Sequence, residues 1–129
     1  MNQFSPHWKS INTLAELDHV VDESRHKPAL ILKHRPTSPK SILIKNTLER
    51  DWSISPEMVN VFVVDDLKNN DVSAEVSELA GVEPEFPQIV LFADGVTMYD
   101  EAGDMISVKK IKLALKIVNR TFRWMETRA

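Results

Sequence analysis

The chain contains no cysteine. This absence excludes a dithiol active site, a structural disulfide and any metal site with cysteine ligands that one molecule could form. The fold must therefore be stabilised by its hydrophobic core alone. A length of 129 residues with 43% apolar residues is sufficient for one such core, so we expect a single domain over residues 1–129.

Glycine is also scarce, with three in the whole chain, and neither a dinucleotide-binding fingerprint nor a P-loop is present. The longest apolar runs fall far short of the roughly 18 residues that span a bilayer. The first residues have neither the basic nor the apolar segment of a signal peptide. We therefore expect no bound cofactor, no membrane contact and a cytoplasmic location.

The formal net charge of -3 argues against a general nucleic-acid binder, although cations gather in the last third of the chain. They surround an apolar series with helical spacing, which predicts a helix over about 108–124 whose outer face is solvated. We favour this interpretation over a phosphate-binding patch, and an interaction surface on this helix stays open as a third class of function. The cations are Lys109, Lys110, Lys112, Lys116, Arg120, Arg123 and Arg128, and the apolar series is Val108, Ile111, Leu115, Val118, Phe122 and Met125.

Apolar periodicity and turn signals predict five strands and four helices in the order β-α-β-α-β-α-β-β-α. The expected strands are 8–11, 29–33, 59–64, 88–92 and 96–99, the last two joined by a hairpin turn at Asp94-Gly95. The first expected helix begins after Thr13, and the other three cover 39–50, 72–80 and 108–124. The inward residues of the first three helices are expected to be Leu14, Leu17, Val20 and Val21, then Ile42, Leu43 and Leu48, then Val72, Val76, Leu79 and Ala80.

The segment of residues 33–41 reads Lys-His-Arg-Pro-Thr-Ser-Pro-Lys-Ser and follows a short buried strand. Ser38 is expected to cap the next helix and Pro39 to be its first residue. Downstream, Pro87 directly precedes the first hairpin strand, and we expect the Phe86-Pro87 bond to be cis. These features place Ser38 at a helix N-terminus at the edge of a sheet.

The chain resembles the monothiol bacilliredoxin-like proteins of the bacillithiol system, which have a thioredoxin-like fold. Their pattern across this loop is Lys-His-Ser-Thr-x-Cys-Pro-x-Ser, so that the cysteine falls on Ser38. The resemblance implies an α/β domain with a mixed four- to five-stranded sheet and helices on both faces. It also implies that Ser38 occupies the catalytic position and that the substrate-binding residues are His34, Thr37, Pro39, Ser41, Phe86 and Pro87.

The family activity implied by the resemblance is removal of bacillithiol from mixed disulfides on proteins by a single thiolate. A serine hydroxyl stays protonated near neutral pH and does not attack a disulfide sulfur, so we expect no such activity from this chain. The alternative is a non-catalytic module that binds a peptide or a low-molecular-weight thiol. The expected partner is a low-molecular-weight thiol or a protein mixed disulfide.

Two origins of Ser38 remain open. One is an engineered replacement of a cysteine, made to trap a state or to prevent disulfides between molecules. The other is a native serine in a divergent member, which we favour because Arg35, Pro36 and Lys40 also depart from the family pattern. A cysteine codon at position 38 of the encoding gene would identify the first.

Other polar residues are interpreted as structural. No two of the four histidines have the spacing of four that presents two imidazoles on one helix face, so no metal site is expected, although His34 lies near Ser38. Asp65 and Asp66 are expected in a turn at the end of a strand. The tryptophans are interpreted as packing residues at the edge of the core and are Trp8, Trp52 and Trp124.

Overall fold

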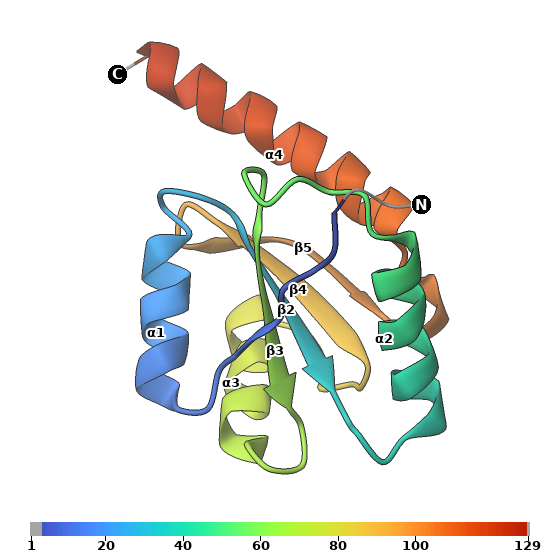
Figure 1. The fold of residues 1–129 in the computed structure, drawn as a ribbon. Helices are drawn as coiled ribbons and strands as arrows, with labels where there is room; N and C mark the ends of the chain where they lie inside the picture. The colour runs from blue at the N-terminus through green and yellow to red at the C-terminus, as the bar shows by residue number, and fades with distance from the viewer. Residues whose placement is uncertain (1–3, 129) are drawn as a thin grey trace.

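The computed structural model describes residues 4–128, and side chains over residues 4–121. A central sheet carries helices on both faces (Figure 1). The strands are β1 (Lys9–Ser10), β2 (Ala29–His34), β3 (Asn60–Asp65), β4 (Gln88–Ala93) and β5 (Val96–Ala102). The helices are α1 (Leu14–Glu23), α2 (Pro39–Asp51), α3 (Asn70–Ala80) and α4 (Val108–Arg128), with a 3-10 turn, η1 (Gly103–Met105), before α4.

The sheet has five strands in the order β1-β3-β2-β4-β5. β1, β3 and β2 are parallel, as crossovers through α1 and α2 require, whereas β4 is antiparallel to both β2 and β5. Leu30 is level with Val61 on β3 and with Leu91 on β4. The expected parallel pairing of 29–33 with 59–64 and the mixed thioredoxin-like sheet are confirmed.

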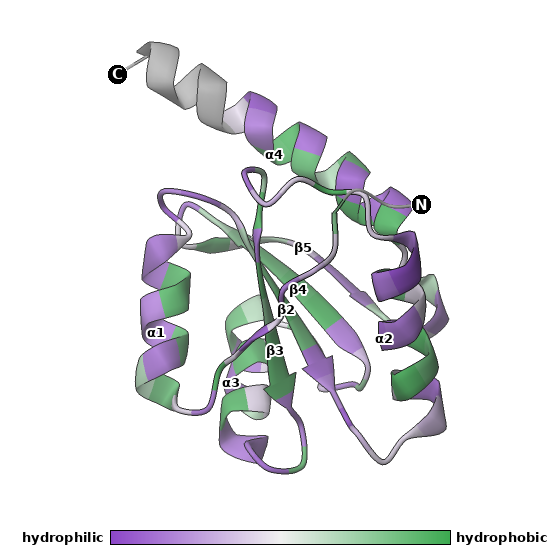
Figure 2. Cartoon of the chain, in the orientation of Figure 1, coloured by the Kyte–Doolittle hydropathy of each residue, from purple (hydrophilic) through white to green (hydrophobic). Residues whose placement is uncertain are grey.

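Two apolar layers lie on opposite faces of the sheet. Even-numbered residues of β2, such as Leu30 and Leu32, pack with α2 and α4, whereas Ala29 and Ile31 pack with α1 and α3. β2 and β4 lie between the two layers, and Figure 2 shows that both are apolar over most of their length and hydrophilic at one end, where Lys33 and His34 end β2 and Gln88 begins β4. Polar side chains that point into either layer need polar partners there.

Local signals set the ends of the elements. The Thr13 hydroxyl accepts a hydrogen bond from the Glu16 backbone N–H at 3.1 Å and caps α1. Gly81 ends α3 with a φ of 69°, a conformation that favours glycine. The hairpin turn also has positive φ at Asp94 and Gly95, as its Asp-Gly sequence predicts.

Some residues expected to face inward are exposed. On α2, the structure buries Ile44 and Leu48 but leaves 41% of Ile42 and 63% of Leu43 exposed, so the expectation for the last two is wrong. Leu14 on α1 and Leu79 on α3 are exposed as well. Each helix contacts the sheet along a narrower stripe than its apolar composition suggests, because only two faces of a sheet are available for four helices.

The exposed outer face of α4 is confirmed for Lys109, Lys112, Lys116 and Arg120. The side chains of residues 122–128 lie outside the described ones; among them are the cations Arg123 and Arg128, the expected apolar residues Phe122 and Met125, and Trp124. Trp52 is buried and Trp8 packs beside it, with ring centroids 6.2 Å apart, as expected of packing residues. Within residues 4–128, no helix has both the length and the apolar character that a membrane span requires.

Candidate functional site

Ser38 lies at the N-cap of α2, in the loop that follows β2. Its backbone is extended, and its hydroxyl accepts a hydrogen bond from the Ser41 backbone N–H at 3.3 Å. Pro39 is the first helical residue and fits this position, since the first N–H groups of a helix have no partner within the helix. Ser38 is half-buried, and Thr37 and Pro39 beside it are exposed. A nucleophile at position 38 would therefore be accessible to a ligand.

The loop that carries Ser38 contacts the loop before β4. The Arg35 guanidinium carbon lies 3.5 Å from the centroid of the Phe86 ring, a cation–π contact. The Phe86–Pro87 peptide bond is cis. Pro87 is buried, and its carbonyl accepts a hydrogen bond from the Gly103 N–H at 3.0 Å, whereas 40% of Phe86 is exposed. The structure thus joins residues 34–38 to Phe86 and Pro87 along one end of the sheet.

Ser41 orients His34 beneath this loop. Ser41 is fully buried, and its Oγ accepts a hydrogen bond from the Arg35 backbone N–H at 3.0 Å. The same Oγ lies 2.7 Å from Nδ1 of His34. When the imidazole proton is on Nε2, the Ser41 hydroxyl donates to Nδ1 while its oxygen accepts from the Arg35 N–H. In this tautomer His34 offers an N–H donor to a ligand at the loop.

The pKa of His34 is lowered from its ordinary value, chiefly by burial and secondarily by the charge of Lys45. A lowered pKa in the folded state means that this state binds fewer protons than the unfolded state below about pH 6.5. We therefore expect the free energy of unfolding to rise as pH increases through the folded pKa towards about 6.5, and the contribution of His34 to level off above it.

The measurement is urea unfolding between pH 5 and 8 of the wild type and His34→Gln. The control is His26→Gln, which replaces an exposed histidine in the loop before β2. The difference between the wild type and His34→Gln should favour the wild type increasingly as pH rises. A difference that is the same at every pH, or that appears equally in His26→Gln, would contradict the role assigned to burial of His34.

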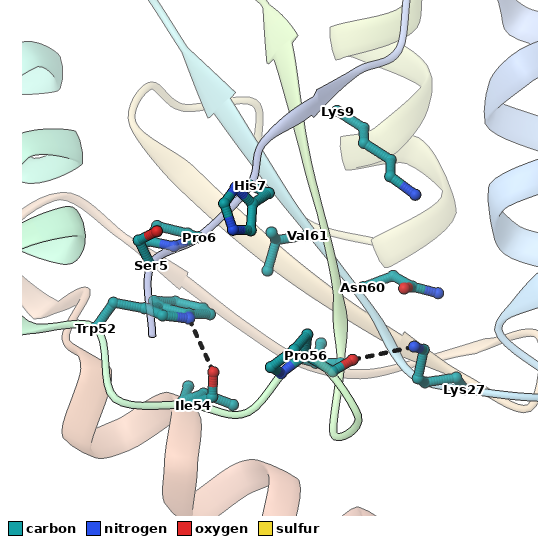
Figure 3. A pocket seen from close by; sticks show the side chains of 11 residues that line it. Ser5, Pro6, His7, Lys9, Lys27, Trp52, Ile54, Pro56, Asn60 and Val61 are labelled. Carbon is teal, nitrogen blue, oxygen red and sulfur yellow. Dashed lines mark hydrogen bonds between the residues drawn. The ribbon is translucent and has the colours of Figure 1, made fainter. Parts of the chain in front are cut away.

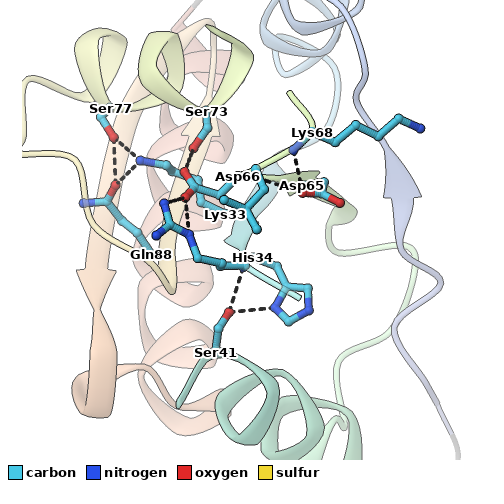
Figure 4. A network of polar contacts seen from close by, with 11 residues as sticks. Lys33, His34, Ser41, Asp65, Asp66, Lys68, Ser73, Ser77 and Gln88 are labelled. Atoms are coloured by element: carbon cyan, nitrogen blue, oxygen red, sulfur yellow. Dashed lines mark hydrogen bonds and ion pairs between the residues drawn. The ribbon is translucent and has the colours of Figure 1, made fainter. Parts of the chain in front are cut away.

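A buried lysine lies behind the loop, on the face of the sheet that packs on α3 (Figure 4). Only 1% of Lys33 is exposed, and its Nζ donates hydrogen bonds to Ser77 Oγ and, at 3.0 Å, to Gln88 Oε1. The Ser77 hydroxyl also donates to Gln88 Oε1 at 2.8 Å. Burial lowers the pKa of Lys33, and the charges of Asp66 and Glu85 oppose this shift. The ammonium group is thus held inside the protein by neutral partners and by the nearby carboxylate of Asp66.

Asp66 connects this region to the loop. It is 6% exposed, and its Oδ2 accepts hydrogen bonds from Nη2 and, at 2.9 Å, from Nε of Arg35. Its Oδ1 accepts a hydrogen bond from the Ser73 hydroxyl at 2.5 Å. Both residues lie where the turn was expected: Asp65 accepts the turn N–H groups of Leu67 and Lys68. Asp66 is the first residue of the turn, and its side chain in addition joins Arg35 to Ser73.

The structure gathers the sequence-predicted residues at one end of the sheet: His34, Thr37, Ser38, Pro39 and Ser41 in one loop and helix start, and Phe86 and Pro87 in the facing loop. Sequence reasoning missed the buried polar network of Lys33, Asp66, Ser73, Ser77 and Gln88. The sequence did indicate part of it. Lys33 and Gln88 lie two positions from Ile31 and Val90 on their strands, so their side chains are on the same buried face of the sheet.

A depression lies at the opposite end of the parallel strands from Ser38, beneath the segment that leads into β1 (Figure 3). Its volume is about 160 Å³; its floor includes Trp52 and Val61, and His7 and Lys9 lie at its rim. Lys27 lines it but already donates to the Pro56 carbonyl at 3.0 Å. Over the described side chains, no group of histidines and carboxylates has the arrangement of a metal site.

Comparison with known proteins agrees with this architecture. The model of the family described as monothiol bacilliredoxin BrxC matches residues 9–111. Thioredoxin from Trypanosoma brucei brucei superposes with a TM-score of 0.71 at 12% identity, over 93% of this chain and 97% of that one. Thioredoxin from Fasciola hepatica gives a TM-score of 0.68 at 19% identity, over 85% and 98%. No curated protein matches the chain significantly in sequence.

Proposed function

Because this chain belongs to the monothiol bacilliredoxin family, we propose that it is a thiol-oxidoreductase relative without exchange activity. The observation that carries the proposal is the Ser38 hydroxyl at the N-cap of α2. In the resemblance of residues 33–41 to the family pattern, the cysteine falls on this serine. Exchange requires a sulfur nucleophile, and the chain contains none. A hydroxyl at this position supplies only a hydrogen-bonding group.

We further propose that the site binds rather than transforms its ligand, between residues 34–38 and Phe86-Pro87. The Nε2–H of His34 and the ring of Phe86 would supply a donor and an apolar contact there. The family supports a low-molecular-weight thiol such as bacillithiol, free or in a mixed disulfide with a protein. A peptide is the second candidate, because Phe86 exposes 40% of its surface beside the loop. The proposal includes a cytoplasmic location, where thiols are kept reduced.

The test of inactivity is release of a fluorescent thiol from a protein mixed disulfide, measured with and without this protein. We expect the same rate in both, because buffer alone accounts for any release. Turnover above that background by the chain with Ser38 would overturn the proposal.

Binding is measured separately by titrating oxidised bacillithiol and an unrelated disulfide of similar size into labelled protein. NMR shift changes should saturate at His34 and Thr37 with the first and leave His26 unchanged. Absence of saturable shifts with either ligand would remove the low-molecular-weight thiol and leave the peptide, to be tested by the same titration.

A further inference from the structure

A groove lies between β5 and α4. Its volume is about 370 Å³, and its apolar lining consists of Met98, Tyr99, Leu113, Ala114, Ile117 and Val118. Two of these, Leu113 and Ile117, lie one helical turn apart on α4 and expose 60% and 57% of their surfaces. Met98 on β5 exposes 41%. Large apolar side chains grouped in this way mark an interaction surface.

The single carboxylate in the lining of this groove is already neutralised. Glu101 accepts a hydrogen bond from the Tyr99 hydroxyl at 2.9 Å, and its carboxylate lies 3.8 Å from Nζ of Lys110. Burial raises the pKa of Tyr99, and the hydrogen bond to Glu101 and the charges of Glu101 and Asp100 raise it further. The groove therefore presents an apolar surface without an unpaired negative charge.

Cations line the adjoining side of α4. Lys109, Lys112 and Lys116 border another shallow depression beside Leu113, whose one carboxylate, Asp51, is paired with Arg50. Arg120 continues the row of cations one turn further along α4. All four are exposed, and over the described side chains none of them forms an ion pair. Figure 2 shows apolar and hydrophilic bands side by side along α4. This row is cationic although the whole chain has a net charge of -3.

From this juxtaposition we propose that the groove between β5 and α4 is a docking site for an acidic amphipathic helix of a partner protein. Apolar residues of the partner would cover Leu113 and Ile117, and its carboxylates would face Lys109, Lys112 and Lys116. A second copy of this chain is a poorer occupant, because pairing two α4 helices would bring like charges together.

The site is separate from the Ser38 loop. In Figure 1, α4 crosses the top of the molecule, whereas the loop between β2 and α2 is at the bottom. A partner on α4 would leave Ser38 accessible, so the docking proposal does not depend on the proposed function of the Ser38 site.

The probe is a labelled 18-residue helical peptide with leucine on one face and glutamate on the other, and the matched probe has lysine in place of glutamate. Fluorescence anisotropy is measured with the full chain at low and high salt. We expect saturable binding of the acidic peptide alone, weakened several-fold by salt because exposed charges are screened. Equal binding of the two peptides, or no saturation with either, would overturn the proposal.

Matched variants distinguish this groove from other exposed surfaces. Leu113→Ser with Ile117→Ser should weaken binding at least about tenfold, as loss of central apolar anchors does, and Leu43→Ser with Leu67→Ser should not. Lys112→Glu with Lys116→Glu should weaken binding and reduce its salt dependence, unlike Lys9→Glu with Lys68→Glu. All eight positions are exposed, so the fold should be retained, as checked by circular dichroism.

Three further outcomes would contradict the proposal, by placing the peptide elsewhere or by giving the groove another occupant. The first is unchanged peptide binding by the Leu113/Ile117 double variant. The second is self-association in sedimentation that this double variant abolishes. The third is binding to vesicles of anionic lipid in the absence of any binding to the acidic peptide.

Discussion

Ser38→Cys is expected to convert the chain into a monothiol that undergoes a single round of disulfide exchange. The introduced thiolate would attack one sulfur of a disulfide, form a new S–S bond to it and release the other sulfur as a thiolate. The wild type has no sulfur nucleophile and should show none of this chemistry. The expected change is thus from background to a measurable rate.

The N-terminus of α2 should lower the pKa of the introduced thiol. The Ser41 N–H that now donates to Ser38 Oγ would donate to the thiolate, and the helix dipole adds to this effect. Nearby cations contribute less than their number in the sequence suggests. Arg35 is paired with Asp66, and Lys40 lies 3.8 Å from Asp104.

Lys33 and His34 also do little to lower the pKa of a thiol at position 38. The Lys33 ammonium is buried among Ser77 and Gln88, and the lowered pKa of His34 favours its neutral form at pH 7. We therefore expect the thiol pKa in the upper part of the range of about 3.5–7.5 that such environments produce, near 7.

The measurement is the rate of iodoacetamide alkylation as a function of pH, with Ser10→Cys in the exposed strand β1 as the matched control. At pH 6 a pKa of about 7 gives roughly 30-fold more thiolate than a pKa of about 8.5, and lower intrinsic nucleophilicity offsets about fivefold of this. Alkylation should thus be about sixfold faster than in the control. An identical pH profile for the two variants would show that residue 38 is an ordinary surface cap.

The reaction of the Ser38→Cys variant with a mixed disulfide should stop after one turn. Ser41 lies on the first turn of α2 but is a hydroxyl engaged with His34, so the chain has no second thiol to resolve the product. Mass spectrometry should show one adduct per chain, released only by added thiol. Repeated turnover without added thiol would contradict this sequence of steps.

Asp66→Ala should cause the largest loss of stability among the polar substitutions in this region. It removes two hydrogen bonds from Arg35 and one from Ser73 and leaves the Arg35 guanidinium, whose side chain is 29% exposed, without its counterion. Breaking a buried pair costs about 3–5 kcal/mol, and the partial exposure of Arg35 reduces the expected cost to about 2–3 kcal/mol. Urea unfolding followed by circular dichroism measures it.

Asp66→Asn separates the effect of the charge from that of the hydrogen bonds, and Asp18→Ala is the control. Asp66→Asn retains a carbonyl oxygen that can accept from Ser73 or Arg35 and should lose about half as much stability. Asp18→Ala, at an exposed position on α1, should change stability by less than about 0.5 kcal/mol. If Asp66→Ala costs no more than Asp18→Ala, the network does not stabilise the loop that carries Ser38.

The element order and the place of Ser38 could be predicted from local sequence. An apolar run of strand length, a serine before proline and an Asp-Gly turn each act within a few residues, where backbone sterics and capping decide the outcome. Side chains alternate between the two faces of a strand, so the sequence also places Lys33 on the face of Ile31 and Gln88 on the face of Val90. Their burial could not be predicted from this alternation alone, because it requires that helices cover both faces of β2 and β4.

Tertiary structure decided which polar groups became partners. Lys33 and Ser77 are 44 residues apart, and Arg35 and Asp66 are 31 apart, so no local pattern joins them. Packing four helices on two sheet faces likewise determined that Ile44 is buried and Leu43 exposed. The sequence by itself determined that Ser38 begins α2 and that the chain has no thiol, because these facts depend on residue identity and local capping. Whether the charges around that position are free or neutralised depends on distances between elements, which only the folded chain establishes.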